Sequence, residues 1–104
     1  MTYKFRFFFD PGSGVCLWSG DDRTREKFDY PVESRKLPVP ENLQRKLEYI
    51  VAWDDTAIDW DYLPDPSPWP QEEWDRFRKE TDSLLLALRQ ALGPEFEIVD
   101  ERKF

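Results

Sequence analysis

The sequence predicts an α+β domain in which a small, mostly antiparallel sheet carries two helices on one face. Near the start of the chain, aromatic residues alternate with polar ones as in a half-buried strand. Two later stretches carry apolar residues at helical spacing, and a short alternating stretch follows the second. The expected order is strand, strand, strand, helix, helix, strand. With 104 residues the chain can bury one hydrophobic core, so we expect a single domain over residues 1–104.

The first two predicted strands form a hairpin. Residues 2–9 alternate strictly except at Phe8, which interrupts the polar face. The Asp-Pro-Gly-Ser-Gly sequence at 10–14 predicts a chain reversal, because proline presets φ and glycine accepts a positive φ. Residues 15–18 are expected to return beside the first strand.

The next stretch is predicted to be a loop followed by a third strand. Residues 20–27 are polar throughout, which is typical of a loop. Phe28, Tyr30 and Val32 then alternate, and Pro31 places this strand at the sheet edge because proline has no N–H to donate. Residues 33–40 are expected to be an extended connection, because of the prolines near its end.

Two helices and a last strand complete the predicted fold. The first helix should begin at residue 40 or 41 and end near 53–55, since its apolar residues share one stripe. Proline at every second position makes residues 63–70 a stiff extended loop. The second helix is predicted over residues 71–92, with an acidic first turn and Gly-Pro directly after it. Residues 95–100 predict the last strand.

The segment from Trp53 to Asp75 combines carboxylates with large aromatic side chains. From Asp54 to Asp75 there are eight acidic residues and no Lys or Arg, a charge of −8 against −7 for the whole chain. Trp and Tyr are enriched at interface hot spots, and acidic residues around them steer a basic partner. We therefore predict a partner-binding surface formed by Asp54, Asp55, Asp59, Trp60, Asp61, Tyr62, Asp65, Trp69, Glu72 and Glu73. The alternative for the aromatic residues is a loop that folds back and caps the helix pair.

Composition narrows the function classes. The chain has no histidine, which excludes Ser-His and Cys-His nucleophile pairs, and no enzymatic activity, catalytic residue, metal or cofactor is expected. Its net charge of −7 argues against nucleic acid or an anionic membrane as the main partner. Cys16 is the only cysteine, so no intrachain disulfide can form, and we expect a cytoplasmic protein.

Two alternatives use the same carboxylates differently. Asp54, Asp55, Asp59 and Asp61 offer the oxygen ligands that Mg²⁺ and Ca²⁺ prefer, which would suit a metal-dependent hydrolase. Their spacing is not that of a calcium-binding helix-loop-helix, and short acidic clusters are usually solvated. In the second alternative, the chain is a non-catalytic accessory or structural protein whose acidic loop only confers solubility.

A small, acidic, tryptophan-rich domain without catalytic motifs resembles bacterial immunity proteins, the antitoxins of contact-dependent and polymorphic toxin systems. The resemblance covers size, charge and element order, and in particular the Trp-Asp and proline-rich stretch from Trp53 to Trp74. It implies tight one-to-one binding of a cognate toxin domain, which in many such systems is a basic nuclease. These proteins share no common motif, so the resemblance assigns no role to an individual residue.

Overall fold

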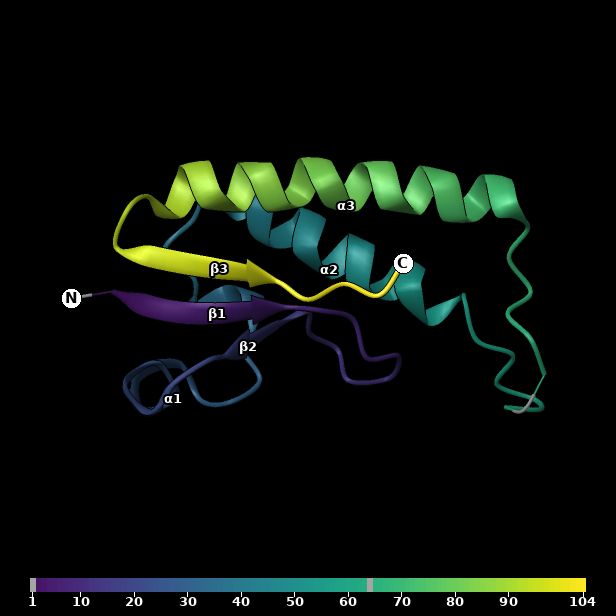
Figure 1. Cartoon of the computed structure of the whole chain (residues 1–104), viewed down its shortest axis with the longest axis horizontal. Coiled ribbons are helices and arrows are strands. Elements are labelled where there is room, and N and C mark those ends of the chain that lie inside the picture. The colour runs from purple at the N-terminus through teal and green to yellow at the C-terminus, as the bar shows by residue number, and fades with distance from the viewer. Residues whose placement is uncertain (1, 64) are drawn as a thin grey trace.

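The α+β class is confirmed by the computed structural model, which describes residues 2–63 and 65–104. Figure 1 shows the helices α2 and α3 beside the sheet, with α1 next to the strand β2. The elements in chain order are β1 (Tyr3–Phe7), β2 (Leu17–Ser19), α1 (Asp22–Phe28), the 3₁₀ turn η1 (Ser34–Lys36), α2 (Glu41–Asp55), α3 (Gln71–Leu92) and β3 (Phe96–Asp100).

The sheet is mixed, with the strand order β2-β1-β3. The predicted hairpin is confirmed: β1 and β2 are antiparallel, and Phe7 lies opposite Leu17. β3 instead runs parallel to β1, with Phe5 opposite Ile98, so the sheet is not mostly antiparallel. The reason is visible in Figure 1: α3 carries the chain back along the sheet, so β3 starts at the same end as β1.

The prediction of a loop over residues 20–27 was wrong, because this stretch contains α1. The Asp21 side chain caps the helix by accepting a hydrogen bond of 2.9 Å from the Thr24 amide. Thr24 and Phe28, four positions apart, are the buried residues of α1. The Thr24 hydroxyl also accepts a hydrogen bond of 2.8 Å from the Lys4 amide, which ties α1 to β1.

The predicted third strand over residues 28–32 was also wrong. Phe28 ends α1, and the residues after it meet β2 only at an isolated bridge between Trp18 and Pro31. The Ser19 amide donates to the Tyr30 carbonyl at 2.8 Å and the Val32 amide to the Leu17 carbonyl at 2.9 Å, and the pairing does not extend beyond this bridge. The following connection contains η1 rather than being extended throughout.

Both long helices were predicted correctly, α3 with the same bounds. They pack on the sheet face that carries Phe5, Phe7 and Ile98, all of which are buried. The buried helix residues of this core are Leu47 and Ile50 from α2 and Phe77, Leu84, Leu85, Leu88 and Leu92 from α3. Within the predicted loop 63–70, Pro64 lies outside the described residues, and the others belong to no helix or strand.

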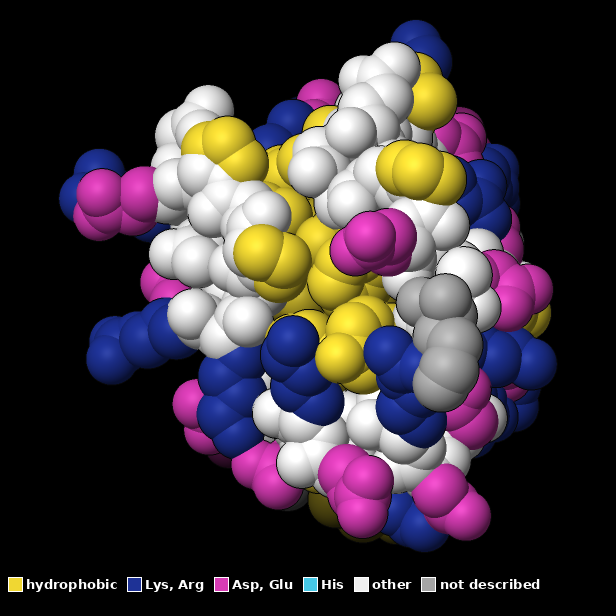
Figure 2. Space-filling model, turned by 90° about the vertical axis from the view of Figure 1, so that its left-hand side faces the viewer, with side chains coloured by type: hydrophobic (Ala, Val, Ile, Leu, Met, Phe, Trp, Pro, Cys, Tyr) yellow, Lys and Arg dark blue, Asp and Glu magenta, His cyan; other side chains and the backbone are white. Residues whose placement is uncertain are grey.

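The molecule is elongated, with extents of 43 × 23 × 22 Å. Figure 2 views one end, where hydrophobic side chains occupy the centre and both basic and acidic side chains lie around them. At the start of β1, the Arg23 guanidinium lies 4.6 Å from the centre of the Tyr3 ring, and the Lys27 ammonium lies 5.0 Å from it. The connection between α2 and α3, which carries the acidic loop, projects at the opposite end (Figure 1).

Candidate functional site

The described part of the connection between α2 and α3, residues 56–63 and 65–70, is held in place by side-chain hydrogen bonds. The indole nitrogen of Trp60 donates to the Asp55 carbonyl at 2.8 Å. The indole nitrogen of Trp69 donates to the Thr56 hydroxyl, also at 2.8 Å. Both bonds return the loop to the C-terminal end of α2, so its exposed side chains are presented from an ordered backbone.

Three large apolar side chains that are close in sequence are exposed on this loop. Trp60 is 55% exposed, Tyr62 60% and Leu63 62%. Leu63 was not among the predicted site residues. The signal that could have identified it is an aliphatic residue next to a proline-rich run, where no regular element can bury it. We call Trp60, Tyr62 and Leu63 the exposed apolar patch.

Trp69 is placed differently from the other aromatic residues of the loop. Its ring centre lies 4.7 Å from that of Trp74, 5.0 Å from Phe77 and 6.1 Å from Trp53. These contacts make it part of the aromatic cluster between α2 and α3. The structure therefore brings Trp60 and Tyr62 to the surface and packs Trp69 against the core.

Two carboxylates of the predicted surface stabilise the loop itself. Asp55 accepts a hydrogen bond of 2.9 Å from the Gly12 amide in the hairpin turn. Asp59 accepts hydrogen bonds from the amides of Asp61 and Tyr62, at 3.1 and 3.2 Å, and so forms a local turn. Both carboxylates therefore accept hydrogen bonds from the chain's own backbone, and these bonds help to hold the loop in its conformation.

The remaining carboxylates form the outer acidic surface. Asp61 and Asp65 are exposed on the loop, and Glu72 is exposed in the first turn of α3. Glu73 is half-buried and pairs with Arg76 one turn later, at 2.5 Å. Asp61 and Asp65 therefore flank the exposed apolar patch in sequence, and Glu72 adds exposed negative charge at the start of α3. These charges can act on an approaching partner.

Asp54 is the exception among the predicted carboxylates, because it is only 6% exposed. Burial, together with the negative charges of Asp55 and Asp10, raises its pKa to about 6. It lies in the last turn of α2, where the helix dipole is also negative and no basic residue is present. A buried carboxylate without a cation is rare in structural positions and more typical of functional ones.

Asp54 faces a groove of about 490 Å³, which we call the aromatic groove. One side is formed by the hairpin at residues 8–11 and the other by the end of α2 and the residues after it, 54, 57 and 58. Residues 67, 74, 103 and 104 complete the wall. The groove is thus built from segments that are far apart in sequence.

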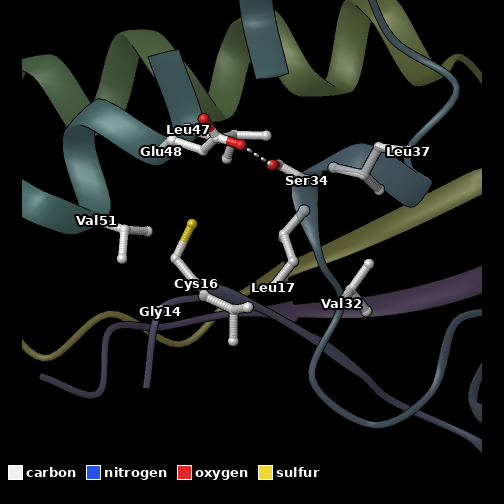
Figure 3. Close-up of a pocket in the computed structure, with 10 residues that line it drawn as sticks. Gly14, Cys16, Leu17, Val32, Ser34, Leu37, Leu47, Glu48 and Val51 are labelled. Carbon is white, nitrogen blue, oxygen red and sulfur yellow. Dashed lines mark hydrogen bonds between the residues drawn. The ribbon is translucent and has the colours of Figure 1, made fainter. Parts of the chain in front are cut away.

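A second cavity, beside Cys16, is too small for a ligand. Its volume is about 20 Å³, room for one water molecule. Figure 3 shows Cys16 and Val51 directed into it, with the Ser34 hydroxyl hydrogen-bonded to Glu48 at its margin. Burial, and secondarily the charge of Asp54, raises the pKa of the Cys16 thiol well above its usual range, so the thiol stays protonated and unreactive.

Neither a metal cluster nor a membrane span is found within residues 2–63 and 65–104. No three His, Cys, Asp or Glu side chains of this part come together as metal ligands would. None of its helices is both long and apolar enough to cross a bilayer. The described geometry thus adds no ligand group in favour of the metal-dependent hydrolase.

Neither a protein-family model nor a curated protein matches the chain. No role is therefore transferred to its residues from a relative. What the acidic end can do follows from its own contacts, burial and charge.

Proposed function

We propose that this protein is a toxin-neutralising immunity protein. It binds a basic toxin domain through its acidic surface and thereby keeps that domain from its target. The observation that carries the proposal is the exposed apolar patch on a loop that also carries exposed carboxylates. Trp60, Tyr62 and Leu63 are each more than half exposed. In a stable monomer such residues are usually scattered, whereas clustered ones mark a contact surface.

The order of the loop supports binding rather than solubility alone. An acidic segment that served only to solubilise the protein would need no fixed conformation. Here Trp60 is hydrogen-bonded to the Asp55 carbonyl and Asp59 holds the turn that positions Tyr62. A preorganised anchor loses less conformational entropy on binding, which favours a tight complex.

The distribution of charge supports a basic partner. The loop and the first turn of α3 present Asp61, Asp65 and Glu72 on the same end of the molecule as the patch. Such a surface accelerates association with a positively charged domain and opposes binding to polyanions. A basic nuclease domain, whose own site attracts nucleic acid, fits this surface.

The test is co-purification of the tagged chain from cells that also express its neighbouring genes, followed by identification of the bound protein. The expected result is a one-to-one complex with a domain that is lethal when expressed alone and harmless with this chain. Trp60→Ser together with Tyr62→Ser should abolish both capture and protection. The matched control is Tyr49→Ser with Leu86→Ser, which removes side chains 68% and 58% exposed on the helices. Capture and protection that survive the loop variant would refute the assigned surface.

A further inference from the structure

The aromatic groove contains a buried carboxylate that the described chain leaves without a partner. Asp54 is 6% exposed and lines the groove. The charges that act on it, from Asp55 and Asp10, are both negative, and no hydrogen bond or cation offsets them. Among the described residues, no fully enclosed side-chain oxygen lacks a partner, so the Asp54 oxygens open into the groove.

Negative potential converges on this groove from several directions. The C-terminal end of α2 contributes the negative end of its dipole, with no basic residue in the last turn. Asp10 lies across the groove on the hairpin and adds a second carboxylate to the wall. A cation placed there would gain from all of these sources, and from a low local dielectric.

The walls of the groove select the kind of cation. Phe9, Trp74 and Phe104 line it, and the centre of the Phe104 ring lies 5.9 Å from that of Phe9 and 6.0 Å from that of Trp74. Aromatic faces attract organic cations, and a planar guanidinium stacks on them better than an ammonium does. A guanidinium can also donate two parallel hydrogen bonds to one carboxylate.

We propose that the aromatic groove binds the guanidinium group of an arginine side chain, which pairs with Asp54 and stacks against the aromatic wall. The arginine is carried by the basic domain of the proposed function, and to that extent this inference rests on it. Lys103 lines the same groove with an exposed ammonium, so it competes with the incoming guanidinium.

The experiment uses the whole chain and a small probe, so it does not depend on finding the partner. n-Butylguanidinium is titrated at pH 7.5 while backbone amide shifts are followed by NMR, with n-butylurea as the neutral probe of the same shape. We expect saturable shifts at groove residues with the cation and none with the urea. Asp54→Asn should weaken binding by at least about tenfold, since it removes the charge-assisted pair.

Two further variants test the competing lysine and the effect of net charge. Lys103→Gln should tighten binding about threefold, because it removes the competing cation. Glu26→Gln, an exposed position on α1, changes the net charge by the same amount as Asp54→Asn and should leave affinity within about twofold. Asp54→Asn is expected to fold, since it removes a buried charge and keeps the shape.

The inference is overturned if the cation gives no saturable shifts in the groove, if the urea binds equally, or if Asp54→Asn binds as the original chain does. Its failure is separable from that of the proposed function. Capture of a toxin without probe binding would refute the groove and retain the function. Asp54-dependent probe binding without any toxin partner would retain the groove and refute the proposed function.

Discussion

Gly12 lies directly against the indole of Trp60: a Cβ atom on Gly12 would lie 3.3 Å from the ring carbon Cη2. The Gly12 amide also donates to the Asp55 carboxylate at 2.9 Å, and Trp60 donates to the Asp55 carbonyl. These contacts connect the hairpin turn, the end of α2 and the exposed apolar patch. The orientation of Trp60 therefore depends on a glycine far away in sequence.

Gly12→Ala should lower stability and displace Trp60. The φ of Gly12 is +86°, where a side chain costs about 1 kcal/mol, and the new methyl group would press on the indole. Gly14→Ala is the matched control, because its φ is +81° and nothing lies within 4 Å of the added Cβ. Urea unfolding should show a larger loss for Gly12→Ala, and the Trp60 indole resonance should move only in that variant. Equal losses with an unmoved resonance would show that the contact does not position the ring.

Substitution of Trp60 and substitution of Trp69 should lower the unfolding free energy by different amounts. Trp69→Ala removes contacts to Trp53, Trp74 and Phe77 and should cost about 3 kcal/mol of unfolding free energy. Trp60→Ala, at a side chain 55% exposed, should cost no more than about 1 kcal/mol. Thermal unfolding of the two variants measures the difference. A loss for Trp60→Ala as large as that for Trp69→Ala would mean that Trp60 serves packing too.

Local signals explain which helices the sequence could predict. α3 has a long apolar stripe, an acidic first turn and a Gly-Pro stop, and these signals act within one or two helical turns. α1 buries only Thr24 and Phe28, and one pair of residues is too few to reveal a helical repeat in the sequence. The parallel pairing of Tyr3 with Phe96 joins the two ends of the chain, and no local pattern encodes it.

The candidate site likewise depends partly on local sequence signals and partly on contacts between distant residues. Composition located the acidic, aromatic segment, but it could not distinguish Trp60 from Trp69, because their burial depends on distant contacts. The packing of Trp69 is decided by Thr56, Trp74 and Phe77. Asp54 likewise lines a groove to which the hairpin and the C-terminal residues, both far away in sequence, contribute.

Asp54→Asn should stabilise the protein at neutral pH. The pKa of Asp54 is raised from 3.8 to about 6, so the folded state favours the neutral carboxyl. This contribution to stability is complete below pH 3.8 and is lost as the pH rises through 6. At pH 7 the variant should therefore be more stable than the original chain, by up to about 3 kcal/mol. Water in the groove screens the charge of Asp54 and reduces this gain.

Urea unfolding of both proteins at several pH values measures that difference in free energy. The advantage of Asp54→Asn should shrink between pH 7 and pH 4, while Asp61→Asn, at an exposed position, should show no such trend. The other ionisable groups facing this region are Asp10, Asp55, Lys103 and the Cys16 thiol. An advantage that stays constant with pH would contradict a raised Asp54 pKa as its cause.

Charge reversal on the loop should slow association with the captured toxin domain. Asp61→Lys with Asp65→Lys replaces exposed acid beside the patch and leaves Asp59, which holds the turn, intact. Stopped-flow association should be at least about tenfold slower at low salt, and the effect should shrink near 0.5 M salt, where the Debye length is only a few ångströms. Glu26→Lys with Glu95→Lys makes the same change in net charge at exposed positions of the other end. If this control slows association equally, net charge rather than the acidic loop steers the partner.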